Sequence, residues 1–354
     1  MADPVDRGHP GDFAHMNGWD AEYELYSDHD LPTYVGPTTF GNLPWVTDPA
    51  ELRRRLVDVA IVGAPFDDGT SHRPGARFGP RAIREAQSAS GSLNSLQLGV
   101  EPFEFLTVVD AGDANIVPSF TQRSHALIHR KVREVAATGA IPIVLGGDHS
   151  ITWPSATAVA EVRYPGSIGI VHFDAHADTG PDLWGVLASH GTPMRRLIES
   201  GAVRGRNFVQ VGLRGYWPPV EVFDWMREQG MRWHLMREIE ERGAESVIDD
   251  AIAEALDGPD SVYLSIDIDV IDPGMAPGTG TPEPGGMLTR EVLRAIRRIV
   301  GAVELAGMDV VEVSPPFDHA EVTAGAANRC VLEAISALAV KRRAGGRVRH
   351  EPGP

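Results

Sequence analysis

The sequence predicts an α/β fold in which a mainly parallel sheet is covered by helices on both faces. From residue 57 onward, short β-branched runs alternate with longer segments of helical periodicity, and this alternation is typical of parallel sheets. The chain has 354 residues, which is enough to bury a substantial core. It contains neither an internal repeat nor a linker that would divide this body, so we expect one domain.

The expected elements follow one another in a regular order. Apolar, β-branched runs predict strands over residues 57–66, 105–112, 141–147, 167–176, 207–215, 261–270 and 303–313. Helical periodicity predicts helices over residues 123–138, 152–163, 190–200, 219–229, 288–300 and 325–342.

Both ends of the chain differ from this body. Residues 1–55 are rich in Gly, Pro, Asp, His and aromatic residues without sustained periodicity, so we expect an irregular N-terminal arm. Phe40, Leu43 and Trp45 are its expected contacts with the body. The body itself spans residues 56–342, and residues 343–354 are expected to form a flexible tail.

Charge and cysteine content exclude several classes of protein. The chain has 49 acidic and 32 basic residues and a formal charge of −17, which disfavours nucleic acid or an anionic membrane as a partner and suits a small cationic substrate. The single cysteine, Cys330, excludes a disulfide framework and lies in an apolar helical stretch, which predicts a buried thiol. No signal-like start and no run of 18 apolar residues occurs, so we expect a cytoplasmic protein.

The segment HFDAHAD, residues 172–178, carries a histidine or an aspartate at every second position. Successive side chains of an extended chain point to opposite faces, so His172, Asp174, His176 and Asp178 are expected on one face. Such a face must be solvated, paired or bound to something. His172 lies deeper in the expected strand, and we interpret it as a hydrogen-bonded core residue rather than a ligand.

Two other expected strands also end in polar residues. His149 follows the strand 141–147 in GGDHS, where Asp148 is a candidate helix N-cap, and SIDIDV ends the strand 261–270 with Asp267 and Asp269. Ligands of open α/β sheets collect outside the carboxyl ends of the strands. Each cluster alone is compatible with a turn or a surface ion pair, but three clusters at three strand ends predict one shared site.

A buried site cannot hold this many carboxylates and imidazoles as bare charges, because desolvation and mutual repulsion oppose it. Cations must therefore be present. A carboxylate-rich site with two imidazoles favours two divalent ions of the Mn²⁺ type, whereas zinc more often has cysteine or three histidine ligands. The candidate metal ligands are His149, Asp174, His176, Asp178, Asp267 and Asp269.

The motifs GGDHS, HFDAHAD, SHGTP, SIDIDVIDPGMAPGTGTPEPGG and MDVVEVSPP resemble, in this order, those of the ureohydrolase family of arginase, agmatinase and guanidinobutyrase. The resemblance covers residues 57–340 and implies a three-layer α/β/α arginase-like fold, with residues 56–342 as the catalytic domain. It also implies two metal positions that share two aspartates. One metal would be held by His149, Asp174, Asp178 and Asp267, and the other by Asp174, His176, Asp267 and Asp269.

The same resemblance implies hydrolysis of a guanidino group to urea and an amine. Water bound by two such ions has a lowered pKa and attacks the planar guanidinium carbon. Glu312, in MDVVEVSPP, matches the family carboxylate that pairs with the guanidinium. His190, in SHGTP, matches the family histidine assigned to proton transfer. Taken alone, these two would be interpreted as a strand carboxylate and a histidine at a helix start.

The segment RPGARFGPRAIR, residues 73–84, also matches a family segment, and we interpret it as mainly structural. Pro80 suits the first turn of a helix. The arginines are expected to pair with loop acids such as Asp67 and Asp68.

The loop after Asp178 bears on the substrate. Arginases carry an asparagine two positions after this aspartate, and here the residue is Gly180, so arginine is a poor candidate. The resemblance favours agmatine, with 4-guanidinobutyrate or free guanidine, the latter with Ni²⁺, as alternatives. Arg214 would either neutralise a carboxylate tail or form a structural pair. The tentative pocket residues are Trp184, Arg214, Tyr216 and Trp217.

Three other classes of protein fit the sequence less well. A one-zinc deacetylase does not need His149 and Asp269, a dinuclear phosphoesterase needs histidine-rich loops that the sequence lacks, and a regulatory pseudoenzyme does not need the full residue set. The family resemblance further implies a homo-oligomer, either a trimer or a hexamer.

Overall fold

The protein was analysed as a computed structural model, which describes residues 34–87, 93–163 and 167–350. Its strands form one sheet in the order β2-β1-β3-β8-β7-β4-β5-β6, and every pairing is parallel. The strands are β1 (Val59–Ala64), β2 (Val108–Asp113), β3 (Ile141–Gly146), β4 (Ile168–Phe173), β5 (Phe208–Leu213), β6 (Arg232–Leu235), β7 (Ser261–Asp267) and β8 (Glu304–Val311).

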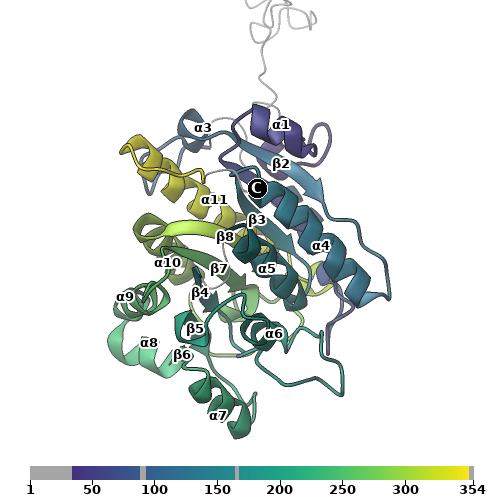
Figure 1. Ribbon diagram of the computed structural model, residues 1–354, viewed down its shortest axis with the longest axis vertical. Helices are drawn as coiled ribbons and strands as arrows, with labels where there is room; N and C mark the ends of the chain where they lie inside the picture. The colour runs from purple at the N-terminus through teal and green to yellow at the C-terminus, as the bar shows by residue number, and fades with distance from the viewer. Residues whose placement is uncertain (1–33, 88–92, 164–166, 351–354) are drawn as a thin grey trace, which may run out of the picture.

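Helices cover both faces of this sheet. In Figure 1, α9, α10 and α11 lie on one side of the strands, and α4, α5 and α6 lie on the other. The helices are α1 (Pro49–Arg54), α2 (Gly79–Glu85), α3 (Pro102–Phe105), α4 (Thr121–Ala136), α5 (Thr152–Arg163), α6 (Pro193–Glu199), α7 (Val220–Glu228), α8 (Met236–Arg242), α9 (Ala244–Ala255), α10 (Thr289–Ala302) and α11 (Val322–Arg343). The predicted three-layer arrangement is confirmed.

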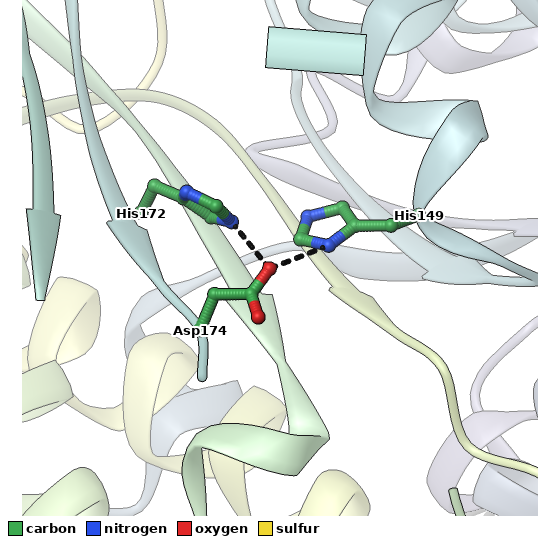
Figure 2. Close-up of side chains that lie close together, drawn as sticks. All are labelled: His149, His172 and Asp174. Carbon is green, nitrogen blue, oxygen red and sulfur yellow. Dashed lines mark hydrogen bonds and ion pairs between the residues drawn. The ribbon is translucent and has the colours of Figure 1, made fainter. Parts of the chain in front are cut away.

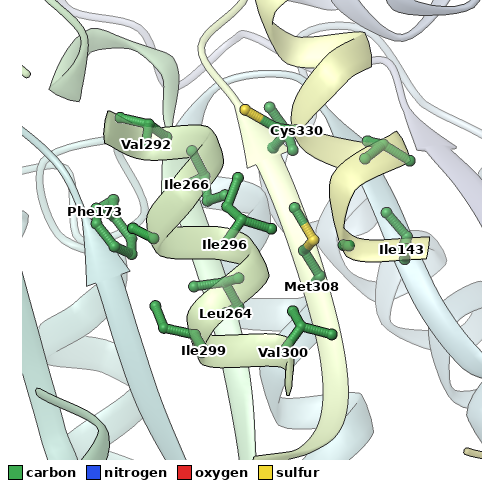
Figure 3. Packing of buried hydrophobic residues seen from close by; sticks show 14 of the residues in the cluster. Ile143, Phe173, Leu264, Ile266, Val292, Ile296, Ile299, Val300, Met308 and Cys330 are labelled. Atoms are coloured by element: carbon green, nitrogen blue, oxygen red, sulfur yellow. The ribbon is translucent and has the colours of Figure 1, made fainter. Parts of the chain in front are cut away.

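The core is divided by the sheet into two hydrophobic clusters. In β3, Ile143 and Leu145 belong to the cluster beneath α10 and α11, whereas the intervening Val144 belongs to the cluster beneath α4 and α5. This alternation follows from the twofold period of a strand that is buried on both faces. Figure 3 shows α10 laying Ile296 and Ile299 against the strands. Cys330 is buried here, as predicted, and burial raises the pKa of its thiol to about 12.

Every predicted strand is present, but the strand β6 and the helices α1, α3, α8 and α9 were not predicted. The strand β6 has four residues, lies at the edge of the sheet and is half-buried, so it lacks the continuous apolar run of the central strands. The helices α8 and α9 follow it and are separated by Gly243, whose φ of 83° ends one helix before the next begins. Within the described ranges, no helix is long and apolar enough to cross a lipid bilayer.

The chain ends differ in part from expectation. In the arm, Phe40 and Leu43 are buried against the body as expected, whereas Trp45 is 54% exposed and residues 49–54 form the helix α1 rather than irregular structure. Residues 1–33 lie outside the described part of the chain. After α11 the chain packs on the body, because the His350 main-chain N–H donates to the Gly139 carbonyl and Val348 is buried. Up to residue 350, this segment is therefore not a free tail.

Candidate metal centre and active site

Four adjacent strands in the middle of the sheet, β3-β8-β7-β4, end at the candidate site. His149 follows β3 and begins a short 3₁₀ turn, His149–Ile151, for which Asp148 is the N-cap, as predicted. Glu312 directly follows β8, Asp267 ends β7, and Asp174 directly follows β4. Parallel strands carry all their carboxyl ends to one edge, so residues far apart in sequence meet there.

The segment HFDAHAD meets this edge in a different way from the one predicted. The strand β4 ends at Phe173, so residues 174–178 are a loop and do not share one face of a strand. The Asp174 Oδ1 atom accepts the His176 main-chain N–H at 2.6 Å, and Asp178 has a φ of 52°. The loop turns back on itself, and this turn, rather than strand alternation, brings the polar side chains together.

The hydrogen bonds of His149 define which ring nitrogen faces the cluster. Its Nε2 atom lies 3.0 Å from the Ser265 hydroxyl, which itself donates to Asp309 Oδ1 at 2.7 Å. The hydroxyl must therefore accept from Nε2–H, which leaves the Nδ1 atom of a neutral ring with a lone pair. Histidine ligands of metals are commonly oriented by such a bond from the second nitrogen.

Three carboxylate oxygens converge on this lone pair. His149 Nδ1 lies 3.1 Å from Asp174 Oδ2, 3.1 Å from Asp178 Oδ2 and 3.0 Å from Asp267 Oδ2. Four electron-rich atoms in one buried place repel one another unless a cation lies among them. The protein alone can supply only a proton, and although burial opposes it, the three carboxylates raise the pKa of His149 well above its usual value. A metal ion fits the same donor set.

A second group lies beside the first and shares Asp174 with it. His176 Nδ1 lies 3.0 Å from Asp269 Oδ2 and 3.4 Å from Asp174 Oδ1. Burial opposes a charge on this ring, but the Asp269 and Asp174 carboxylates raise the pKa of His176 to about 12. Main-chain N–H groups occupy the other oxygens, since Ala175 donates to Asp269 Oδ1 and Asp269 donates to Asp267 Oδ1.

His172 behaves as the core residue that was expected. The Gln210 amide donates to His172 Nδ1 at 3.0 Å, so the ring hydrogen is on Nε2, which lies 2.9 Å from Asp174 Oδ2. The ring is fully buried, and Figure 2 shows it on one side of the Asp174 carboxylate with His149 on the other. His172 therefore orients Asp174 by donating to it, and its second nitrogen faces Gln210 rather than the cluster.

Glu312 and His190 are paired next to this cluster. His190 Nδ1 lies 3.0 Å from Glu312 Oε1, which also accepts the His149 main-chain N–H at 2.8 Å. The other carboxylate oxygen, Glu312 Oε2, is buried and has no hydrogen-bond partner among the described residues. A β-carbon at Gly280 would lie 3.2 Å from this oxygen, so glycine leaves room beside it. Glu312 also has a φ of 65°, a strained conformation for a glutamate.

Of the four tentative pocket residues, Trp217 places its ring beside a histidine ring of the cluster. Its ring is 6.2 Å from the His176 ring, centroid to centroid. Trp184 is 82% exposed and Tyr216 is completely exposed. Arg214 is a structural residue, because each of its guanidinium nitrogens donates to a main-chain carbonyl, including those of Asp269 and Glu283.

The structure also explains why position 180 is a glycine. A β-carbon there would lie 3.1 Å from the Gly191 carbonyl oxygen and 3.6 Å from the Trp217 ring. The asparagine expected of an arginase would therefore meet Trp217 and the SHGTP segment at this position.

Several residues behind the site were missed by the sequence analysis. Ser265 and Asp309 hold His149. Asp148 was expected only as an N-cap, and it also accepts the Gly69 main-chain N–H at 2.7 Å. Each is a single polar residue within an apolar strand or a turn, which gives no pattern of its own. The segment 73–84 was interpreted correctly, since Arg77 pairs with Asp67 and Asp68, and Pro80 lies in the first turn of α2.

Comparisons with known proteins agree with this geometry. Residues 57–336 match the model of the arginase family. Proclavaminate amidinohydrolase of Streptomyces clavuligerus is 41% identical over 302 residues, covering 85% of this chain and 92% of the relative. Its solved structure superposes with a TM-score of 0.79 at 38% identity, over 87% of this chain and 99% of the other.

Two further relatives are nearly as similar. Guanidinopropionase of Pseudomonas aeruginosa is 40% identical over 313 residues, or 88% of this chain and 94% of the relative. Mitochondrial agmatinase of Gallus gallus is 39% identical over 292 residues, or 82% of this chain and 84% of the relative. The chain belongs to the arginase family and is a hydrolase acting on the C–N bonds of linear amidines.

Proposed function

We propose that this hydrolase splits a small linear guanidino compound into urea and an amine. The observation that carries the proposal is Glu312 Oε2, a buried carboxylate oxygen beside a cluster of metal-ligand type, for which the described part of the chain offers no hydrogen-bond partner. A buried acceptor normally has a donor, and a guanidinium supplies N–H donors with a positive charge. Because Glu312 Oε1 is already occupied by His149 and His190, Oε2 is the atom left for a substrate.

The proposed metal positions follow two of three groups of donors; the third, His149, His172 and Asp174, is set aside because His172 Nε2 donates its hydrogen to Asp174. The first comprises His149, Asp174, Asp178 and Asp267, whose ligand atoms lie within 4.8 Å of one another, and the second comprises Asp174, His176 and Asp269. Asp174 is the carboxylate common to both, and a bridging role of Asp267 remains a prediction. Mn²⁺ is the proposed ion because the donors are mostly carboxylates with two imidazoles. When bound, two such ions lower the pKa of water enough to supply a nucleophile near neutral pH.

Substrate binding and proton donation are assigned to two residues of the chain. Glu312 holds the guanidinium in place beside the cluster, which fixes the direction of attack. As C–N bond cleavage proceeds, the departing amine nitrogen must gain a proton, and His190 is the proposed donor. Its ring is buried and hydrogen-bonded to Glu312, so the proton donor and the substrate-binding carboxylate hold each other in position.

Agmatine is the first candidate substrate. Arg214 was the cation that a carboxylate tail would have required, and its donors are all engaged by main-chain carbonyls. The amine end of agmatine is positively charged and fits uncharged or anionic surroundings. The formal charge of −17 likewise favours a cationic substrate.

One observation favours a guanidino acid such as 4-guanidinobutyrate as the second candidate. The half-buried Arg73 guanidinium lies 5.2 Å over the Phe317 ring, and within the described part of the chain no carboxylate pairs with it. The Arg73 carbonyl and Glu312 Oε2 would both contact a β-carbon at Gly280, so this arginine borders the proposed guanidinium position. An arginine with no carboxylate partner among the described residues suits a carboxylate tail.

The test is urea release by the Mn²⁺-loaded protein with agmatine, 4-guanidinobutyrate, guanidine and arginine. Turnover of none of them would contradict the proposal. An Arg73→Gln variant then separates the two candidates. If Arg73 binds a tail, kcat/KM for 4-guanidinobutyrate falls about 10-fold, as for loss of one charged hydrogen bond, while that for agmatine does not fall.

Two further expectations concern the setting of the enzyme. A trimer or hexamer and a cytoplasmic location remain predictions from the sequence. Sedimentation of the purified chain measures the first, and its result does not affect the assignment of the residues above.

A further inference from the structure

Ser71 binds one ring nitrogen of His190 in two ways. Its main-chain N–H donates to His190 Nε2 at 3.0 Å, and its hydroxyl oxygen lies 2.6 Å from the same atom. An N–H group can only donate, so Nε2 presents a lone pair to Ser71 and carries no hydrogen. The ring hydrogen is therefore on Nδ1, which faces Glu312 Oε1 at 3.0 Å.

The opposite tautomer is disfavoured at both ends of the ring. A hydrogen on Nε2 would point at the hydrogen of the Ser71 N–H, and a lone pair on Nδ1 would point at a carboxylate oxygen. The tautomer inferred from these partners also occupies Glu312 Oε1 and leaves Oε2 without a partner among the described residues. The state of the substrate-binding carboxylate thus depends on which nitrogen of His190 carries the hydrogen.

The loop that carries Ser71 is fixed from both sides. Gly69 donates its N–H to the buried Asp148 carboxylate at 2.7 Å, and Gly75 donates its N–H to Asp67 Oδ2 at 2.7 Å. The Gly69 carbonyl in turn accepts the main-chain N–H of His190 at 3.0 Å. A β-carbon at Gly69 would lie 2.9 Å from Asp148 Oδ2, so the loop cannot approach this closely with another residue there.

We infer that Ser71 is a positioning residue for His190, and that its hydroxyl is the partner that changes from donor to acceptor when the ring takes up a proton. The inference rests on the proposed function. In the neutral ring the hydroxyl donates to Nε2. When Nε2 takes up a proton released by the attacking water, the hydroxyl rotates and accepts a hydrogen bond from Nε2–H, which the main-chain N–H cannot do. The ring then passes this proton to the departing amine and returns to its Nδ1–H form.

The charges around His190 favour the protonated ring. Burial opposes it, but the carboxylates of Glu312, Asp178 and Asp148 raise the pKa of His190 to about 9. The Ser71 N–H is the group that opposes a second proton at Nε2. Removing the hydroxyl therefore leaves a protonated ring that faces an N–H without an acceptor.

The first test uses three variants of the Mn²⁺-loaded enzyme. We expect Ser71→Ala to lower kcat about 10- to 100-fold, the lower part of the range for general acid catalysis, with KM changed by less than about 3-fold. Ser71→Thr keeps a hydroxyl and should retain most of kcat. Ser189→Ala is the matched control, because Ser189 is the buried neighbour of His190 and its hydroxyl has no partner within the described residues. Wild-type kcat in Ser71→Ala, or equal losses in all three variants, would overturn the inference.

The second test does not depend on turnover. In ¹⁵N-histidine-labelled full-length protein with diamagnetic Zn²⁺, which binds carboxylate and imidazole donors, the His190 signals report which nitrogen is protonated. The inference requires Nδ1 protonated and Nε2 unprotonated in the neutral ring, and the reverse result would refute it. If no guanidino compound is hydrolysed, the proposed function fails while the tautomer is still decided by this spectrum.

Discussion

Two buried histidines on either side of Ser150 illustrate how differently the same side chain is used. His149 lies among the carboxylates of Asp174, Asp178 and Asp267. His125 is also buried, but it contacts the rings of Phe66 and Trp153 and the Ser150 hydroxyl, the last at 2.9 Å. Carboxylates raise the pKa of His149, whereas burial alone lowers the pKa of His125 to about 4.

The difference lies in the partners rather than in burial. His125 keeps its one hydrogen on Nε2, because the Ser150 hydroxyl already donates to Asp148, and its Nδ1 atom has no partner in the described part of the chain. A proton on Nδ1 would be a buried charge without an acceptor. A buried histidine is therefore a candidate ligand only where several anions face the same nitrogen.

The largest expected effect comes from removing one of the carboxylates that face His149. Asp267→Ala removes one of the three oxygens that face His149 Nδ1. We expect bound Mn²⁺ to fall well below the wild-type content and kcat to fall about 10³-fold or more, since the ions supply the nucleophile. Metal analysis and urea release measure both. Asp260→Ala is the matched control, because Asp260 is exposed and precedes the other end of β7. A fully loaded Asp267→Ala protein would refute the ligand assignment.

The next effect separates substrate binding from metal binding. Glu312→Gln keeps the shape of the side chain and removes the charge beside the cluster. We expect metal content to be unchanged and kcat/KM to fall about 10²- to 10³-fold, the range for loss of one electrostatic contact to the transition state. Assay of urea release together with metal content checks this. A metal-replete and fully active Glu312→Gln enzyme would remove Glu312 from the mechanism.

A smaller effect concerns the stability contributed by His125. Above pH 6.5 the ring is neutral in both the folded and the unfolded chain and adds no pH dependence. As the pH falls from 6.5 toward 4, the unfolded chain takes up a proton that the folded chain does not, so the free energy of unfolding decreases. Between pH 7 and pH 5 the expected loss is about 2 kcal/mol, from 1.36 kcal/mol per pKa unit.

Urea denaturation of wild type and His125→Phe at pH 7 and pH 5 measures this loss. The carboxylate cluster is present in both proteins, so the difference between them isolates His125. Wild type should lose about 2 kcal/mol more than the variant between the two pH values. Equal losses would show that His125 is protonated in the folded protein and that the comparison with His149 is wrong.

The sequence predicted the parts of this protein that repeat a pattern. Buried parallel strands are continuous apolar runs, and the polar residues that end them were correctly placed at one edge of the sheet. The strand β6 was missed because a short edge strand has no such run. The polar residues of HFDAHAD were correctly assigned to the site, but they were expected on one face of a strand and lie in a tight loop instead. The same alternating sequence is compatible with both conformations.

Contacts between distant single residues could not be predicted. The Ser71 hydroxyl and His190 are separated by 119 positions, and no periodicity connects a loop serine with a helix-start histidine. Arg214 was left open between two roles because its charge is visible in the sequence, whereas the carbonyls that surround it are not. Family resemblance supplied Glu312 and His190, but not the partners that hold them.

The metal-ligand cluster and Glu312 lie at the ends of the four central strands, whereas the exposed side chains of Trp184, Val186, Leu187 and Tyr216 lie on loops farther along the chain. A library that randomises these loop positions would therefore sample new surfaces without touching any residue of the cluster or its hydrogen-bond partners. Directed evolution toward other guanidino compounds has a natural starting point there. The sheet edge, in contrast, tolerates little change, because the carboxylates of Asp174, Asp267 and Asp269 each accept a main-chain N–H.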